Sequence, residues 1–75
     1  MKIELKLFAT LVQFLPENSD EYPIDQGETV QSLLGKLGIP EEDVTLYFIN
    51  AARAYLESEI KDGDRVGLFP PVGGG

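Results

Sequence analysis

The residues with the clearest capacity for chemistry lie at the C-terminus. Two prolines between apolar residues precede three glycines that end in the α-carboxylate: Phe69, Pro70, Pro71, Val72, Gly73, Gly74 and Gly75. The prolines fix an extended backbone, and glycine has no Cβ, so the Gly75 carboxylate can enter a channel too narrow for side chains. Seven extended residues span about 23 Å, enough to reach the active site of a bound partner. We prefer this reading to the simpler alternative, a disordered glycine end.

Composition removes most other kinds of chemistry. The 75 residues include no cysteine and no histidine, so disulfides, thiol nucleophiles, thiolate zinc sites and imidazole bases are excluded. A domain of this length buries roughly 60% of its unfolded surface, which leaves no room for a cofactor cavity beside the core. The acidic groups Glu41-Glu42-Asp43 and Asp62/Asp64 lack the spacing of a calcium loop, so we expect solvated turns and no metal site.

The charge balance also limits the partners. Thirteen acidic and six basic residues give a net charge of −7, which disfavours nucleic acid and anionic membranes and favours a basic protein partner. No stretch approaches the roughly 20 apolar residues of a membrane span, and the N-terminus does not resemble a signal peptide. A small domain without disulfides is compatible with a reducing compartment, so we expect a cytoplasmic protein.

Apolar periodicity predicts five strands and two helices. Alternation predicts strands at 2–8, 21–25, 45–50, 54–56 and 65–69, with 45–50 a central strand and residues 50–53 the tip of a hairpin. Apolar residues at i, i+3, i+4 and i+7 predict a helix that Gly38 ends: Val30, Leu33, Leu34 and Leu37. At its start, Thr29 can cap the helix, or Glu28 can lie near its positive end. A shorter helix is expected at 9–15. Gly35 weakens the main helix by about 1 kcal/mol, so we expect something to pack closely there.

One amphipathic helix cannot cover both faces of a doubly wound α/β sheet. We therefore predict an α+β fold in which a mixed four- to five-stranded sheet carries the helix on one face. The first and last strands can then lie side by side in the middle of the sheet, so that a domain of residues 1–69 directs a flexible tail of residues 70–75.

Four stretches together resemble the MoaD/ThiS family of ubiquitin-like β-grasp sulfur carriers. They are the opening strand 3–11, the helix start 29–34, the Lys61-Asp62-Gly63-Asp64 turn and the ending 68–75. The resemblance covers essentially the whole chain. Its most specific part is the Phe-Pro-Pro-Val sequence before the terminal Gly-Gly, which is closer to MoaD, the small subunit of molybdopterin synthase, than to ThiS.

The resemblance implies a cosubstrate rather than an enzyme. An ATP-using adenylating enzyme of the MoeB/ThiF type, related to ubiquitin-activating enzymes, would convert the Gly75 carboxylate to an acyl-adenylate and then a thiocarboxylate. Gly74, the residue before Gly75, would have no side chain to obstruct access to that thiocarboxylate. A MoaE-like large subunit would use the sulfur to build molybdopterin, and Phe69, Pro70, Pro71, Val72 and Gly73 would bind partners. The chain would bind no cofactor itself, since ATP belongs to the activating partner.

Two departures and three alternatives accompany this resemblance. Gly73 replaces a common alanine or serine, and Asn50-Ala51-Ala52-Arg53 replaces the commoner asparagine-glycine turn, which puts a partner contact by that loop in doubt. Phe69 could also be an ordinary core residue. The alternative functions are sulfur donation in a thiamine, tungsten-cofactor or other pathway, a ubiquitin-like modifier that forms isopeptide bonds through Gly75, and an interaction domain with an inert tail.

Overall fold

The middle of the sheet is a parallel pair of strands from the two ends of the chain. β1 (Lys2–Leu7) alternates so that Ile3, Leu5 and Leu7 are buried, and β5 (Arg65–Phe69) buries Val66 and Leu68 in the same way. The register pairs Glu4 with Arg65 and Leu7 with Leu68. The computed structural model describes residues 1–71, and in this range the first and last strands lie side by side, as predicted.

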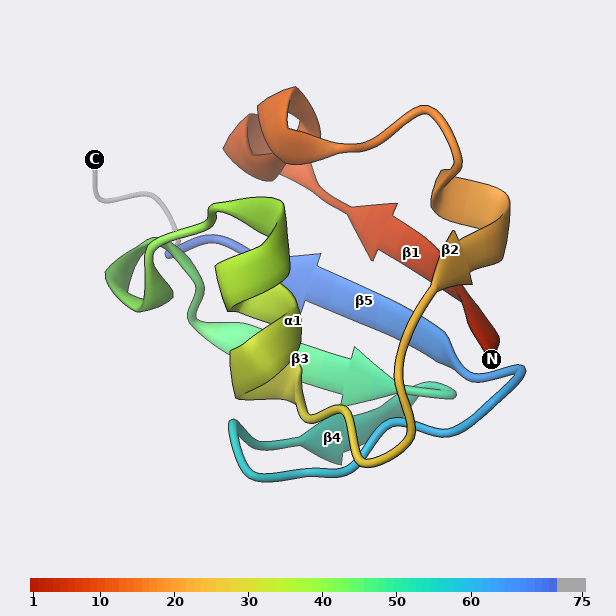
Figure 1. Cartoon of the computed structure of the whole chain (residues 1–75). Coiled ribbons are helices and arrows are strands. Elements are labelled where there is room, and N and C mark those ends of the chain that lie inside the picture. Colours follow the sequence, from red (N-terminus) through yellow and green to blue (C-terminus); the bar gives the residue numbers. More distant parts are fainter. Residues whose placement is uncertain (72–75) are drawn as a thin grey trace.

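Three further strands complete a mixed sheet with the order β2-β1-β5-β3-β4 (Figure 1). They are β2 (Tyr22–Pro23), β3 (Leu46–Ile49) and β4 (Ala52–Ala54). Only β1 and β5 are parallel; the other three pairings are antiparallel. β3 is an internal strand as expected, but β5 is the middle one. The α+β prediction of a mixed sheet with one main helix is confirmed.

The helix α1 (Val30–Leu37) begins and ends where its local sequence predicts. Thr29 and Ser32 form a reciprocal capping box, and Gly38 ends the helix in the left-handed conformation, at φ 74°. The prediction of close packing at Gly35 is wrong, because a Cβ built there would meet no atom within 4 Å.

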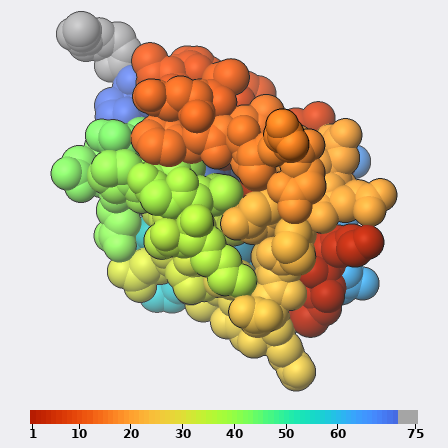
Figure 2. All heavy atoms as spheres, turned by 45° about the horizontal axis from the view of Figure 1, so that its top comes forward, coloured from red at the N-terminus to blue at the C-terminus, as the bar shows by residue number. Residues whose placement is uncertain are grey.

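The core lies between α1 and one face of the sheet. Figure 1 shows α1 crossing β5 and β3, and Figure 2 shows that α1 and the segment before it cover much of this side. The buried cluster joins side chains of β1 and β5 to those of α1 and of the loops: Ile3, Leu5, Leu7, Leu11, Ile24, Val30, Leu33, Leu34, Ile39, Val44, Ile60, Val66 and Leu68. The opposite face of the sheet has no such cover among the described elements.

Several predicted bounds are wrong, for local reasons. Instead of the helix expected at 9–15, a 3₁₀ helix, η1, occupies Ala9–Phe14, because the chain closes i→i+3 hydrogen bonds such as Leu11 N to Phe8 O. Leu15 follows this helix and is exposed. The turns at 17–20 and 41–43 contain short 3₁₀ helices, η2 (Ser19–Glu21) and η3 (Glu41–Asp43). β2 is shorter than 21–25, although Pro23 does lie on an edge strand.

The β3–β4 hairpin turns earlier than predicted. Asn50 and Ala51 both have positive φ, at 53° and 69°, so a two-residue turn connects the strands and β4 occupies Ala52–Ala54 instead of 54–56.

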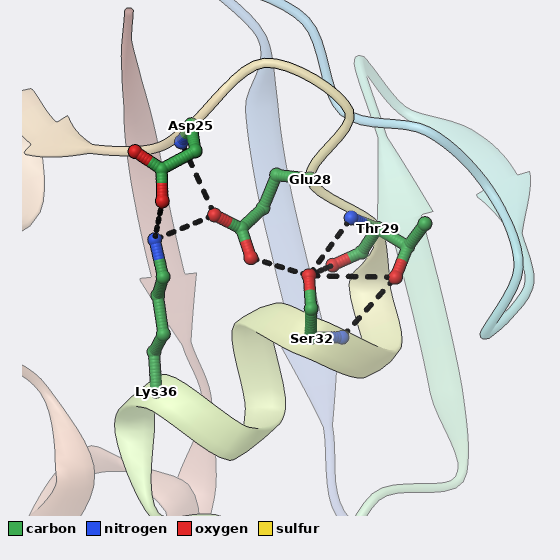
Figure 3. Close-up of polar contacts among 5 residues, drawn as sticks. All are labelled: Asp25, Glu28, Thr29, Ser32 and Lys36. Atoms are coloured by element: carbon green, nitrogen blue, oxygen red, sulfur yellow. Dashed lines mark hydrogen bonds and ion pairs between the residues drawn. The ribbon is translucent and has the colours of Figure 1, made fainter.

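A buried carboxylate anchors the loop before α1 (Figure 3). The Glu28 side chain is 3% exposed and accepts hydrogen bonds from Lys36 Nζ at 2.6 Å, from Asp25 N at 3.2 Å and from the Ser32 hydroxyl. Lys36 also pairs with Asp25, at 3.2 Å. Burial raises the pKa of Glu28, but the bonds from Lys36, Ser32 and Asp25 together outweigh burial and hold that pKa below its ordinary value.

Candidate functional site: the C-terminal strand and the outer face of the sheet

The C-terminal arm begins at the end of β5, the middle strand of the sheet. β5 lies between β1 and β3, and the carbonyl of its last residue, Phe69, accepts a hydrogen bond from Thr45 N at 2.8 Å. Pro70 is half-buried and Pro71 is exposed. The predicted site residues Val72, Gly73, Gly74 and Gly75 lie outside the described residues. The strand therefore fixes where the arm begins.

Phe69 does not belong to the core beneath α1. Val66 and Leu68 are fully buried on the helix side, and Phe69 lies on the opposite face, which we call the outer face. There its ring stacks on Phe8, with centroids 4.2 Å apart and an interplanar angle of 5°, and meets Phe48 edge to face at 5.5 Å. The sequence left core and interface open for Phe69; its surroundings are an aromatic cluster on the uncovered face.

These three rings line a groove of about 340 Å³ along β5. Gly67 lies between them: a Cβ built there would be 3.6 Å from the Phe8 ring, 3.9 Å from the Phe69 ring and 4.0 Å from the Phe48 Cβ. The β1–β5 and β5–β3 registers place Lys6, Gly67 and Phe48 in one row across the sheet. We call this feature the Gly67 groove.

Arg65 lines the end of the Gly67 groove opposite Phe8 and Phe69, and Lys6 lines its side, level with Gly67. Glu4, the β1 partner of Arg65, pairs with both cations: its Oε2 is 3.0 Å from Lys6 Nζ and its Oε1 is 3.3 Å from Arg65 Nε. The bonds from Lys6 and then from Arg65 lower the pKa of Glu4, so this carboxylate stays ionised beside its two cations. The groove therefore runs from an aromatic end to a basic end.

The hairpin turn closes the basic end. Ala51 lines the groove, and Asn50 is tied to the start of β5: its Oδ1 accepts from Arg65 N at 2.9 Å and its Nδ2 donates to Asp64 Oδ1 at 2.9 Å. In the adjacent turn Gly63 has a φ of 84°, a left-handed conformation that glycine adopts without steric cost. Sequence reasoning put a contact by this loop in doubt, yet the turn contributes to the groove wall.

The acidic turns are engaged in structural contacts. Glu41 Oε2 accepts from Gln31 at 2.9 Å, and Asp62 Oδ1 accepts from Lys2 N at 2.8 Å. Within residues 1–71 no group of three or more acidic, histidine or cysteine side chains is arranged to hold a metal ion. In the same range no helix has the length and apolarity that crossing a membrane requires.

Sequence reasoning missed the groove and found only Phe69 of its lining. The missed residues lie on three strands and one turn: Lys6, Phe8, Phe48, Ala51, Arg65 and Gly67. A signal was present, because Phe8 and Phe69 fall in the outward phase of β1 and β5, where polar residues are expected. Two aromatic residues in that phase, on strands predicted to be neighbours, indicate an apolar patch on the outer face.

Comparisons with known proteins agree with this architecture. The model of the ThiS family matches residues 5–75. A candidate molybdopterin converting factor, subunit 1, from Pyrococcus furiosus is 29% identical, with a TM-score of 0.74 over 96% of this chain and 99% of that one. The Haloferax volcanii protein HVO 2177 is 27% identical, with a TM-score of 0.77 over 100% and 87%.

A small archaeal modifier protein 1 from H. volcanii is 25% identical, with a TM-score of 0.68 over 93% of this chain and 97% of that one. No curated protein matches the chain. The family match covers nearly the whole sequence, and the similar structures share its ubiquitin-like β-grasp fold. This chain belongs to the ThiS family of small ubiquitin-like carrier proteins, which are not enzymes themselves.

Proposed function

We propose that this protein carries sulfur for the synthesis of molybdopterin, with the Gly75 carboxylate as the site of attachment. The observation that carries the proposal is the combination of a ThiS-family fold with an arm that leaves the middle strand at Phe69 and ends in Gly74 and Gly75. The similarity to a candidate molybdopterin converting factor subunit favours this pathway over thiamine or tungsten-cofactor synthesis.

The chemistry requires a partner. A carboxylate oxygen of Gly75 attacks the α-phosphate of ATP, pyrophosphate leaves, and an acyl-adenylate forms on an adenylating enzyme of the MoeB/ThiF type. The terminal sulfur of a donor persulfide then displaces AMP and gives an acyl disulfide. A second thiol attacks the donor sulfur of that disulfide, which leaves the thiocarboxylate on Gly75 and a disulfide on the donor. This chain supplies an accessible carboxylate, a narrow approach through Gly73 and Gly74, and a surface that docks. ATP binds to the activating enzyme, and a MoaE-like large subunit receives the sulfur.

The docking surface in this proposal is the outer face around Phe69, continued by Pro70, Pro71 and Val72. Phe8 is 40% exposed beside Phe69, so the start of the arm adjoins aromatic surface that the domain leaves open to solvent. Contiguous apolar surface of this kind marks protein interaction sites. A partner that covers this surface would hold the first residues of the arm at the same time.

A second candidate function is protein modification. It is favoured by the similarity to a small archaeal modifier protein, whose name describes that role. In this case the activated Gly75 carboxyl group forms an isopeptide bond with a lysine amine of a target protein. The two functions share the adenylate and differ in the nucleophile that attacks it.

The test is the intact mass of the protein purified from its own host, with fragmentation of the arm. Replacement of one Gly75 oxygen by sulfur is the expected result. Oxidation of Met1, the only methionine, gives nearly the same mass change, so the fragments must place the change at Gly75. A variant without Gly74 and Gly75 is the control and should remain unmodified.

Reconstitution distinguishes the alternatives. With the host's adenylating enzyme, ATP and a sulfur donor, we expect the thiocarboxylate to form on the full chain. Conjugates of Gly75 with lysines of other proteins, without a thiocarboxylate, would favour the modifier. A chain that remains unmodified in host and reconstitution alike would contradict both functions.

A further inference from the structure

Gly67 is an unusual residue for the middle of the central strand. Glycine inside a strand is destabilising by about 0.5–1 kcal/mol relative to alanine, because it has more freedom to lose on folding. Its backbone here is not in the left-handed region, so this freedom is not needed. Packing does not demand glycine either, since the nearest atoms would lie 3.6–4.0 Å from a Cβ, an ordinary contact distance. What the missing side chain provides is the open space of the Gly67 groove.

The groove has a rigid apolar lining. Phe8 and Phe69 are stacked, and Phe48 meets Phe69 edge to face, so each ring fixes another. All three side chains come from strands of the sheet or, for Phe8, from the residue directly after β1. Because the Gly67 groove is preformed, its side chains lose little conformational entropy when an apolar group enters it.

The charge of this face is opposite to the charge of the molecule. Lys6 and Arg65 line the groove, Arg53 lies in the same cross-strand row as Phe48, and Glu4 is the carboxylate bonded to both lining cations. Three positive charges and one negative charge give a local balance of +2, whereas the whole chain carries −7. Lys2 also lies in the outward phase of β1, so four of the six basic residues lie on the outer face. The acidic chain as a whole favours basic partners, whereas this positively charged site favours an acidic group.

The shape favours a protein segment over a free small molecule. A volume of about 340 Å³ is at the lower end of small-molecule pockets, which are about 300–1,000 Å³ and enclose most of the ligand. This groove is open along the sheet surface, and the described residues contain no buried side-chain polar atom without a partner that could orient such a ligand. One side chain inserted from a covering surface fits the site better.

We propose that the Gly67 groove receives one apolar side chain of a partner protein, on a segment whose neighbouring carboxylate pairs with Lys6 or Arg65. This inference rests on the proposed function for the identity of the partner, the adenylating enzyme. It adds to that function the chemistry of the recognition element: apolar at the aromatic end and acidic at the basic end.

The first test needs no partner protein. The full ¹⁵N-labelled chain is titrated with a capped Asp-Leu-Asp peptide, and with capped Lys-Leu-Lys and Asp-Ala-Asp peptides as controls. We expect the largest amide shift changes at Lys6, Gly67 and Phe69. Binding should be about twofold to fivefold weaker for Lys-Leu-Lys, the size of one exposed ion pair, and at least about tenfold weaker for Asp-Ala-Asp, which lacks two or more buried methylene groups. Shifts elsewhere, or equal binding of Lys-Leu-Lys, would overturn the proposal.

Substitutions at Gly67 test the proposal by filling the groove with a side chain. Gly67→Leu fills the space between the rings, and Gly67→Ala reduces its depth with a Cβ that fits. Gly35→Ala is the matched control, because Gly35 is exposed on α1, away from the groove. Gly67→Leu should abolish the shift changes and Gly67→Ala should weaken them, while Gly35→Ala leaves them unchanged. If circular dichroism shows that Gly67→Leu does not fold, the peptide titration is repeated with Gly67→Ala and Lys6→Gln, which should both bind the Asp-Leu-Asp peptide more weakly than the wild type.

The second test uses pyrophosphate exchange with the adenylating enzyme of the host. Gly67→Leu should raise KM for the carrier at least about fivefold and leave kcat nearly unchanged, because the groove binds and does not react. Normal KM for Gly67→Leu with an active wild-type chain would overturn the groove and leave the proposed function intact. A wild-type chain that is never adenylated would contradict the proposed function. The peptide titration would still show whether the groove binds an apolar side chain beside a carboxylate.

Discussion

Replacing Glu28 by glutamine should cost about 2 kcal/mol of unfolding free energy at pH 7. The Glu28 carboxylate is almost completely buried and accepts bonds from Lys36, Ser32 and Asp25 N. Removing one partner of a fully buried ion pair costs about 3–5 kcal/mol, but Lys36 is 37% exposed and can be solvated when the charge is lost. A hydrogen bond to a charged group contributes about 1.5–3 kcal/mol, and glutamine retains part of the network, which leads to about 2 kcal/mol.

The cost should depend on pH, and its sign follows from the pKa of Glu28. That pKa is lowered in the folded protein from its ordinary value of 4.5, so the unfolded chain binds the proton more readily than the folded one. The stabilisation by Glu28 is therefore complete above about pH 5 and is lost as the pH falls through the folded pKa. The pKa of Lys36 is raised, chiefly by its hydrogen bond to Glu28, so the contribution of Lys36 persists until the pH rises above its ordinary value of 10.5.

Urea unfolding of wild type and Glu28→Gln at pH 7 and pH 3 measures this difference. For a domain of this size about 2 kcal/mol corresponds to roughly 8–16 °C in Tm, so thermal melts give a second reading. Asp25→Asn is the matched control: Asp25 also pairs with Lys36, but its side chain is 86% exposed, so its loss should have little effect. Equal destabilisation by Glu28→Gln at both pH values would refute the assignment of the effect to the charged carboxylate.

Two further substitutions and one insertion have defined outcomes. Gly35→Ala should raise the unfolding free energy by up to about 1 kcal/mol in urea titrations, because the site is exposed within α1 and a Cβ there meets nothing; destabilisation would show an unseen contact. Ala51→Gly should raise the Tm, because glycine removes a left-handed-backbone cost of about 1 kcal/mol at φ 69°, and a lowered Tm would contradict that strain. One glycine inserted between Gly73 and Gly74 should lower kcat in pyrophosphate exchange at least about fivefold at unchanged KM, because it moves the carboxylate by about 3 Å and leaves the docking surface unchanged. A changed KM would show that the glycines themselves contribute to docking.

Sequence predicted well those features that neighbouring residues determine. The ends of α1 follow from Thr29 and Gly38, whose capping functions need only the adjacent backbone. The pairing of β1 with β5 was also predictable, because both strands alternate and one helix must cover their shared apolar face. Spacing alone did not separate a 3₁₀ helix from an α-helix at Ala9–Phe14, since both place i and i+3 on one side.

The remaining features depend on the conformation or burial of single residues. The position of β4 was wrong because alanine rarely adopts positive φ, so Ala51 gave no sign of a two-residue turn. From the sequence, Glu28 is a favourable negative charge near a helix N-terminus. Only the fold shows that the side chain of Lys36, which lies further along α1, bonds to the Glu28 carboxylate. The Gly67 groove combines residues of three strands, and a glycine in a strand does not reveal which side chains surround it.

One strand carries both the candidate recognition site and the start of the C-terminal arm. Gly67 and Phe69 are two residues apart on β5, which is about 7 Å, and both are held by neighbouring strands on each side. A partner that binds the groove therefore holds the arm at a fixed starting point. The six residues from Pro70 to Gly75 can extend about 20 Å from there. In the proposed function, the activating site must therefore lie within that distance of the docking surface, and the domain would determine where the carboxylate reacts.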